Sequence, residues 1–300
     1  SGSRDLDPED ESNLTAHAKW LQVPPSQDAL QTAEALGPIG AIDWLVVDHY
    51  GIDARWEQML RPFVGSILVI DDLADRQHEC DMLLDQNYYL DANSRYDGLV
   101  PPHCRQLIGP GYVILRPEFK HLIDTRLRDR SSVRRLLVNF GGVDPDNVTG
   151  LAVEAVLELQ RPMLAVNVVI GASNPNRTAL EQQLERLPSG VLHVQTTKMA
   201  ALIATADLAL GACGASTWER CYLGLPSLVV VVADNQRQAA ADLHCNGIIE
   251  NLGNARDLTV SVVSTALREL IDAPTRRAAM SRRSIEILSA TGGDIVKLME

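Results

Sequence analysis

The sequence predicts an α/β protein built from two doubly wound domains. Strands and helices alternate regularly from residue 134 onward, about every 20–30 residues. The strands are short apolar runs, which is typical of parallel strands buried on both faces. The chain has 300 residues, a length that favours two domains. We expect a partial N-terminal domain over residues 1–130 and a C-terminal domain over residues 131–300.

The first half carries two clear strand patterns and several weaker elements. In order, we expect helices at 14–22 and 26–37, strands at 43–51 and 66–75, shorter strands at 81–87 and 104–115, and a helix at 115–132. No glycine-rich first turn precedes these elements. A doubly wound sheet normally has its first strand at the centre, so we expect the chain to begin inside an incomplete N-terminal domain.

The second half shows a full set of alternating elements. The strands are predicted at 134–140, 164–171, 191–195, 208–213 and 227–233. The helices are predicted at 147–160, 177–186, 198–205, 216–223 and 236–245, with two or three closing helices after residue 253.

Composition narrows the class of function. The formal net charge of −12 argues against a basic nucleic-acid surface. No apolar run approaches the roughly 20 residues that cross a bilayer, so no membrane partner is expected. The five cysteines have no C-x-x-C spacing, which favours reduced thiols in a cytoplasm and no metal site. The oligomeric state is left open.

Polar and glycine residues follow three strands of the second half. Gly141-Gly142, then Ser216-Thr217 with Glu219, and then Asn235-Gln236 all come at predicted carboxyl ends of strands. Ligands of open α/β sheets bind at that edge, so the coincidence favours a nucleotide. Each motif also has an ordinary alternative: a turn capped by Asp146 or Asn147, a carboxylate complementing a helix dipole, or helix capping by Ser216 or Thr217.

Two strand ends of the first half carry further candidates. Asp48, His49 and Tyr50 follow one strand, and Asp71-Asp72 follow the next. Tyr50 is a plausible donor to a sugar or phosphate oxygen. The paired acids could perform acid-base chemistry, or one of them could cap a turn.

Several long motifs resemble a known family. The stretches are "DWLVVDHYGIDARWE", "VIDDLADRQHECDMLLDQN", "YDGLVPPHCRQLIGPGYVILRPEF", "LLVNFGGVDPDN" and "GACGASTWERCYLGLPSLVVVVADNQ". Together they resemble the UDP-2,4-diacetamido-2,4,6-trideoxy-β-L-altropyranose hydrolases (PseG) of pseudaminic acid biosynthesis. The last stretch also resembles the UDP-binding region of the GT-B-type sugar enzymes related to MurG. The resemblance implies two Rossmann-like domains of the GT-B type, the N-terminal one incomplete. The similarity runs over roughly residues 11–300.

The resemblance implies a reaction and a set of site residues. Water replaces UDP at the anomeric carbon with inversion, and no metal or cofactor is required. Tyr50 and Asn235 match catalytic positions. The positions that match substrate contacts are Gly141, Gly142, Met199, Ser216, Thr217, Glu219, Asn235 and Gln236. The implied partner is a UDP-sugar.

One departure from the family pattern concerns the general base. The family places a histidine in an N-terminal G-x-G-H loop, and this sequence has no such motif. His17 does not match that residue. We therefore expect UDP binding without normal turnover. A GT-B glycosyltransferase and a non-catalytic nucleotide-sugar-binding module are the two alternatives.

Overall fold

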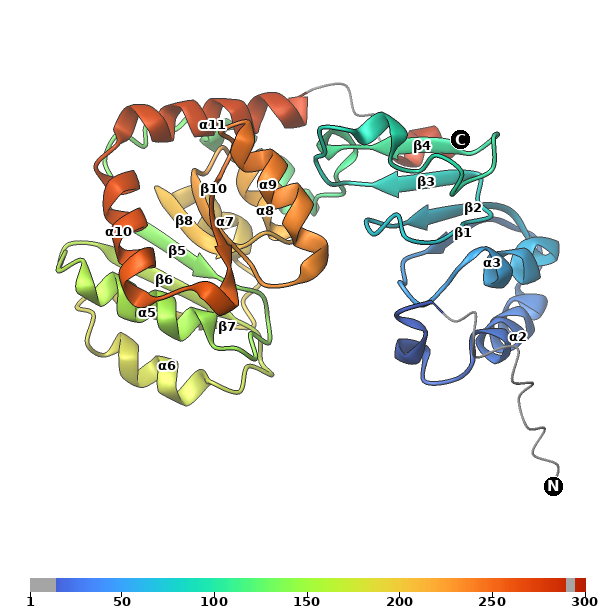
Figure 1. Cartoon of the computed structure of the whole chain (residues 1–300), viewed down its shortest axis with the longest axis horizontal. Helices are drawn as coiled ribbons and strands as arrows, with labels where there is room; N and C mark the ends of the chain where they lie inside the picture. The colour runs from blue at the N-terminus through green and yellow to red at the C-terminus, as the bar shows by residue number, and fades with distance from the viewer. Residues whose placement is uncertain (1–14, 290–294) are drawn as a thin grey trace. The chain divides into compact units, whose positions relative to one another are not determined.

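The computed structural model describes residues 15–289 and 295–300, and these form two compact units (Figure 1). The first unit comprises the described residues up to Tyr112 together with 295–300. The second runs from Val113 to residue 289. Each unit is built on its own parallel sheet, so the predicted α/β class is confirmed.

The first unit contains a four-stranded parallel sheet in the order β1-β2-β3-β4. Its strands are β1 (Ile42–Val47), β2 (Val64–Ile70), β3 (Met82–Asp85) and β4 (Arg105–Ile108). Its helices are α2 (Pro25–Leu36), α3 (Ala54–Leu60) and α12 (Ile295–Leu298). Asp53 begins α3 by accepting a hydrogen bond from the backbone N–H of Arg55 at 3.0 Å.

The second unit contains a six-stranded parallel sheet in the order β10-β9-β8-β5-β6-β7. Its strands are β5 (Arg135–Asn139), β6 (Ala165–Ile170), β7 (Gly190–Val194), β8 (Leu208–Ala212), β9 (Ser227–Val231) and β10 (Glu250–Asn254). Chain order runs outward from β5 to β7 and then returns to place β8 on the other side of β5. This reversal between β5 and β8 is the topological switch point of a doubly wound sheet.

Helices cover both faces of this second sheet (Figure 1). They are α4 (Pro117–Lys120), α5 (Val148–Glu158), α6 (Arg177–Leu184), α7 (Met199–Thr205), α8 (Ser216–Tyr222), α9 (Arg237–Cys245), α10 (Val260–Ile271) and α11 (Pro274–Ser289). Leu136 and Val138 pack into the core that contains residues of α5 and α10. Leu137, which points the other way from β5, packs with residues of α7.

Two stretches lie in a different unit from the one expected. Residues 113–130 pack with the second unit, because Phe119 is fully buried in the cluster that contains Leu137 and Leu223. At the other end, residues 295–300 pack with the first unit. There the indole N–H of Trp44 donates to the carbonyl oxygen of Met299 at 2.9 Å. The domain boundary therefore falls at residues 112 and 113 rather than at 130 and 131.

Two predicted helices are shorter than expected. The helix predicted at 14–22 is a 3₁₀ turn over Ala18–Leu21, and residue 14 lies outside the described residues. The helix predicted at 115–132 is divided into α4 and a 3₁₀ helix at Ile123–Leu127. Among the described residues, no helix is both long and apolar enough to cross a bilayer.

Candidate functional site at the carboxyl edges of the two sheets

The carboxyl ends of β5 and β8 lie next to each other in the second unit. Asn139, the last residue of β5, pairs with Gly211 of β8. The loops after both strands therefore leave the sheet at one place. On the two sides of this place, the connections between strands run to opposite faces of the sheet. This is where open α/β sheets bind ligands.

The loop after β5 exposes its backbone at Gly141. This residue has φ +94, a conformation that favours glycine, and no described atom lies within 4 Å of the position a Cβ would take. Gly142 has a packing role. Its carbonyl oxygen accepts from the N–H of Gly171 at 2.8 Å, and a Cβ on Gly171 would lie 2.8 Å from the Cα of Gly142.

The N-terminus of α5 is already occupied by the protein's own side chains. The Asp144 carboxylate accepts from the N–H groups of Val148 at 3.0 Å and Thr149 at 2.8 Å, and Asn147 accepts from Gly150 at 3.2 Å. Asn147 is the N-cap, one of the two residues expected there. A buried carboxylate therefore uses the amides of this helix end, which leaves no free positive dipole for a phosphate there.

The loop after β8 is organised around Arg220. Its Nη2 donates to the carbonyl oxygen of Ala212 at 2.8 Å and to the hydroxyl of Thr217 at 3.0 Å. Its Nη1 donates to the hydroxyl of Ser216 at 3.0 Å. Thr217 is buried, and its backbone N–H donates to the carbonyl oxygen of Gly214. Thr217 therefore supports the loop and is not available to a ligand, contrary to expectation.

Helix α8 begins without a side-chain cap. Its N-cap is Ala215, so neither Ser216 nor Thr217 performs the capping expected of them. Ser216 is partly exposed, and in the described part of the chain its hydroxyl has no partner beyond Arg220.

Gly211 allows the strand end and Arg220 to approach closely. A Cβ at this position would lie 2.4 Å from the carbonyl oxygen of Asn139 and 3.0 Å from Nη1 of Arg220. The glycine at position 211 therefore makes room for the protein's own groups. Gly214 differs, since a Cβ there would make only an ordinary contact of 3.6 Å with Nε2 of Gln236.

Glu219 presents a partly exposed carboxylate beside this loop. Its side chain is 19% exposed and forms an ion pair with Arg116, whose Nη2 lies 3.1 Å from Oε1. Burial raises the pKa of Glu219, and the neighbouring Arg116 opposes that rise. A carboxylate in this position accepts hydrogen bonds well, as recognition of vicinal ribose hydroxyls requires.

The amides after β9 lie beside the β8 loop. Asn235 and Gln236 form the 3₁₀ helix Asp234–Gln236. The side-chain oxygen of Gln236 accepts from the backbone N–H of Val232 at 3.1 Å, while its NH₂ group faces Gly214. The glycine loop of β8 and the amides of β9 are thus brought together. Met199 begins α7 and packs against the cluster under that helix.

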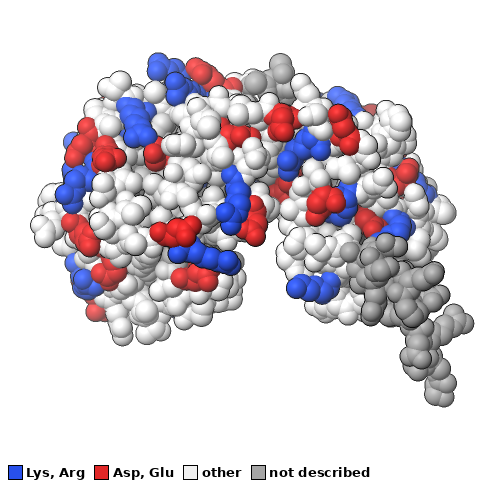
Figure 2. Space-filling model, in the orientation of Figure 1, with Lys and Arg blue, Asp and Glu red and all other residues white. Residues whose placement is uncertain are grey.

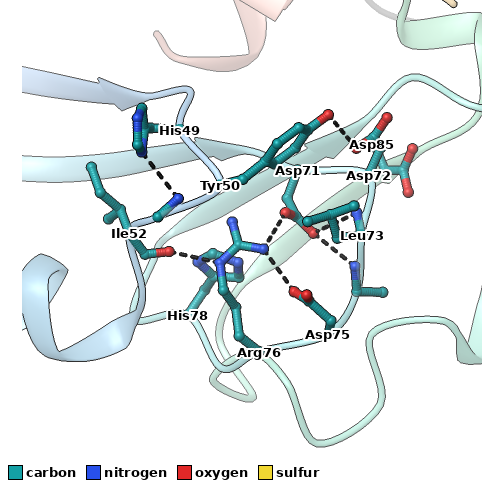
Figure 3. A network of polar contacts seen from close by, with 12 residues as sticks. His49, Tyr50, Ile52, Asp71, Asp72, Leu73, Asp75, Arg76, His78 and Asp85 are labelled. Atoms are coloured by element: carbon teal, nitrogen blue, oxygen red, sulfur yellow. Dashed lines mark hydrogen bonds and ion pairs between the residues drawn. The ribbon is translucent and has the colours of Figure 1, made fainter. Parts of the chain in front are cut away.

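In the first unit, Tyr50 is joined to polar groups from the ends of other strands (Figure 3). Its hydroxyl donates to Oδ1 of Asp72 at 2.6 Å, and Asn87 donates to Oδ2 of the same carboxylate at 3.0 Å. Burial, followed by the hydrogen bond to Asp72, raises the pKa of Tyr50. Tyr50 therefore stays a neutral phenol whose proton is directed to Asp72, and it is not the free donor that the sequence suggested.

The two adjacent acids after β2 have different roles. Asp71 is buried, accepts from the backbone N–H groups of Leu73 and Ala74, and pairs with Arg76 at 2.8 Å (Figure 3). Asp71 therefore caps a turn, which was the alternative to acid-base chemistry for one of the two acids. Asp72 is the acid that faces Tyr50, and burial raises the pKa of its carboxyl.

His49 has a local structural contact. Its Nδ1 accepts from the backbone N–H of Gly51 at 3.0 Å, as Figure 3 shows.

Asp85, the last residue of β3, is a further buried acid of the first unit, and burial raises the pKa of its carboxyl to about 6. Within the described residues, no group of three or more potential ligands is arranged to hold a metal ion.

Sequence reasoning missed Arg116 and Arg220. Arg116 lies far from Glu219 along the chain, so no local pattern links the two residues. The contact of Arg220 with Ser216 could have been predicted from the sequence. Arg220 follows Ser216 by four positions, a spacing that brings side chains together on one helix face.

The second half of the chain is similar to a known domain family. Residues 147–295 match the family model of the glycosyltransferase family 28 C-terminal domain. This part of the chain is therefore similar to that domain. The match covers α5 through α11 and includes the β8 and β9 loops of the site.

Curated relatives confirm the resemblance to the hydrolase family. The chain is 30% identical, over 138 residues, to the UDP-2,4-diacetamido-2,4,6-trideoxy-beta-L-altropyranose hydrolase of Campylobacter jejuni. The aligned region makes up 46% of this chain and 47% of that protein. It is 29% identical over 216 residues to the spore coat polysaccharide biosynthesis protein SpsG of Bacillus subtilis, 71% of this chain and 62% of that one. The chain thus spans about half to three-fifths of the length of these relatives.

Solved structures show the fold. The MurG of Acinetobacter baumannii aligns with a TM-score of 0.60 at 13% identity, covering 92% of this chain and 78% of that one. The fold is therefore the GT-B type predicted from the sequence.

Proposed function

We propose that this protein binds the UDP part of a UDP-linked sugar at the carboxyl edge of the second sheet and hydrolyses the bond to the sugar. The proposed substrate is a UDP-2,4-diacetamido-2,4,6-trideoxy sugar, as in pseudaminic acid biosynthesis, and the products are UDP and the free sugar. The similarity to the Campylobacter jejuni hydrolase supports this choice.

One observation carries the nucleotide assignment: the β8 loop at the switch point joins a partly exposed Ser216 hydroxyl to the Glu219 carboxylate within a single turn of helix. The hydroxyl supports a phosphate contact and the carboxylate a ribose contact. Gly141 adds exposed backbone from the neighbouring strand end. Asn235, Gln236 and Met199 are proposed to complete the site, with Met199 beside the base.

In the proposed reaction, a water oxygen attacks the anomeric carbon while the bond from that carbon to the UDP oxygen breaks. The bonding electrons leave with UDP, and a proton of the water passes to the solvent, because this sequence lacks the G-x-G-H histidine that is the base of the resembled family. Tyr50 is proposed as a catalytic residue. Because its proton is directed to Asp72, its oxygen lone pairs remain to accept a hydrogen from a sugar N–H or O–H group. The two acetamido groups of the proposed sugar carry such N–H groups.

The family 28 domain supports a second candidate, a glycosyltransferase that passes the sugar to an acceptor instead of water. The products separate the candidates. Because the histidine base is missing, we expect incubation with the UDP-sugar alone to release UDP and free sugar only slowly, with the opposite anomer detected first by NMR. A glycoside formed only when an acceptor is present indicates the transferase. UDP binding by calorimetry without release indicates a binding module, and absence of both rejects the proposal.

A further inference from the structure

The proposed diphosphate site needs a positive charge, and the N-terminus of the neighbouring helix, where phosphates commonly bind, does not supply it. The N-terminus of α5, which follows the first loop of the switch point, is occupied by the Asp144 carboxylate. On the face drawn in Figure 2, basic and acidic side chains of the described residues are interspersed. No broad basic field on that face attracts an anion, so a local charge has to do so.

Arg220 supplies such a charge directly beneath the β8 loop. The residue is 2% exposed, and it forms no ion pair with a carboxylate within residues 15–289 and 295–300. Its acceptors are one carbonyl oxygen and two hydroxyls, all of them uncharged. Its Nε is buried without a partner in this described part. Glu219, the adjacent acid, pairs instead with Arg116.

A buried guanidinium without a counter-charge is costly, and it keeps its proton. Burial lowers the pKa of Arg220, but arginine stays protonated in proteins. The loop is shaped around this group, because only glycine at position 211 leaves space between the Asn139 carbonyl and Nη1. Glu219 acts on Arg220 electrostatically but pairs with Arg116, so an anion bound above the loop would add a counter-charge.

We infer that Arg220 is a positioning residue for the diphosphate: it fixes Ser216 as a hydrogen-bond donor and supplies the site's permanent positive charge. This inference rests on the proposed function. A hydroxyl has one hydrogen to donate and two lone pairs that accept. Arg220 occupies a lone pair of Ser216, which leaves the O–H directed at an acceptor such as a phosphate oxygen. The guanidinium acts through Ser216 and through its field, and it does not contact the ligand.

The test compares UDP with uridine, which has the same ribose and base but no phosphate. We expect Arg220→Gln to lower the ratio of UDP affinity to uridine affinity by about tenfold or more, because a charge-assisted contribution is lost. Arg220→Lys keeps the charge but loses the guanidinium fork that holds Ser216, so the ratio is expected to fall by less than it does in Arg220→Gln. Ser216→Ala is expected to lower the ratio by about threefold to tenfold while leaving uridine binding unchanged.

The matched control is Arg161→Gln, which removes an arginine of the same unit that already has a carboxylate partner, Asp272 at 2.6 Å. This variant is expected to keep the wild-type ratio. Equal losses of uridine and UDP affinity in Arg220→Gln indicate a purely structural role and overturn the inference, as do equal ratios for the Gln and Lys variants. If Arg220→Gln does not fold, an unchanged ratio in Ser216→Ala overturns it. Failure of the wild-type protein to bind UDP rejects the proposed function as well.

Discussion

Arg116 and Glu219 form an ion pair at 3.1 Å although 103 positions separate them in the sequence. The pair ties the segment before α4 to the first turn of α8 within the second unit. It also places a cation on the carboxylate that the proposal assigns to the ribose. Arg116 contacts Oε1 only, and an ionised carboxylate has further lone pairs, so Glu219 can keep this ion pair and still accept from ribose hydroxyls.

Glu219→Ala is expected to weaken UDP binding by about 1–3 kcal/mol, because the ribose hydroxyls lose a buried acceptor. Isothermal titration calorimetry with UDP measures the change. Glu219→Gln, which keeps the shape and one acceptor oxygen, should lose less. An unchanged affinity in the alanine variant reassigns Glu219 to a role in the helix alone.

UDP affinity is expected to fall as the pH decreases through the pKa of Glu219. Burial raises that pKa, so the protonated, weaker acceptor appears at a higher pH than for an exposed glutamate. Removing Arg116 takes away the group that opposes the rise. Arg116→Ala should therefore move the decline to still higher pH, as followed by calorimetry in a pH series.

The control for this series is Glu219→Gln, which cannot ionise at that position. The UDP affinity of the Glu219→Gln variant should therefore not fall as the pH decreases through this range. If wild type, Arg116→Ala and Glu219→Gln share one pH profile, the carboxylate of Glu219 does not govern binding.

Gly211→Ala is expected to destabilise the second unit by about 1–3 kcal/mol, as overpacked core positions do. Its Cβ would lie 2.4 Å from the backbone oxygen of Asn139, which a rigid strand cannot readily yield. Denaturant unfolding measures the loss. Gly214→Ala is the matched control, since its Cβ makes only a 3.6 Å contact and should cost far less. Similar costs for both variants contradict the packing role given to Gly211.

Tyr50→Phe is expected to reduce the rate of UDP release with little change in UDP affinity, because Tyr50 belongs to the first unit and not to the nucleotide loops. Steady-state kinetics and calorimetry separate the two effects. Tyr88→Phe removes another phenol of the first unit as a control and should retain activity. A Tyr50→Phe variant with full turnover removes Tyr50 from the catalytic residues.

Asp72→Asn tests the direction of the Tyr50 hydrogen bond. The charged acceptor helps to raise the pKa of Tyr50, after burial, so its loss should lower the pKa of that phenol. Absorbance at alkaline pH follows phenolate formation, with Tyr50→Phe identifying the contribution of this residue. No difference between Asp72→Asn and wild type contradicts the assigned partnership.

The sequence alone determined the parallel strands and the positions where polar loops follow them. Apolar runs such as that of β9 can be buried only in a sheet covered on both faces, and glycine and small residues mark where such strands end. For this reason Gly141, Ser216, Glu219 and Gln236 were predicted at one edge, and the strand order places their loops there.

Only the tertiary structure decided what those side chains contact. Asp72 on Tyr50 and Arg116 on Glu219 depend on which distant segments become neighbours, whereas Asp144 on the α5 amides and Arg220 under the β8 loop are local contacts that depend on rotamers. Sequence spacing carries no information about contacts across the switch point, because β5 and β8 are neighbours in the sheet although the elements from α5 to α7 separate them in the chain. Charge pairing and burial, which set the pKa values and the available donors, are therefore properties of the folded chain.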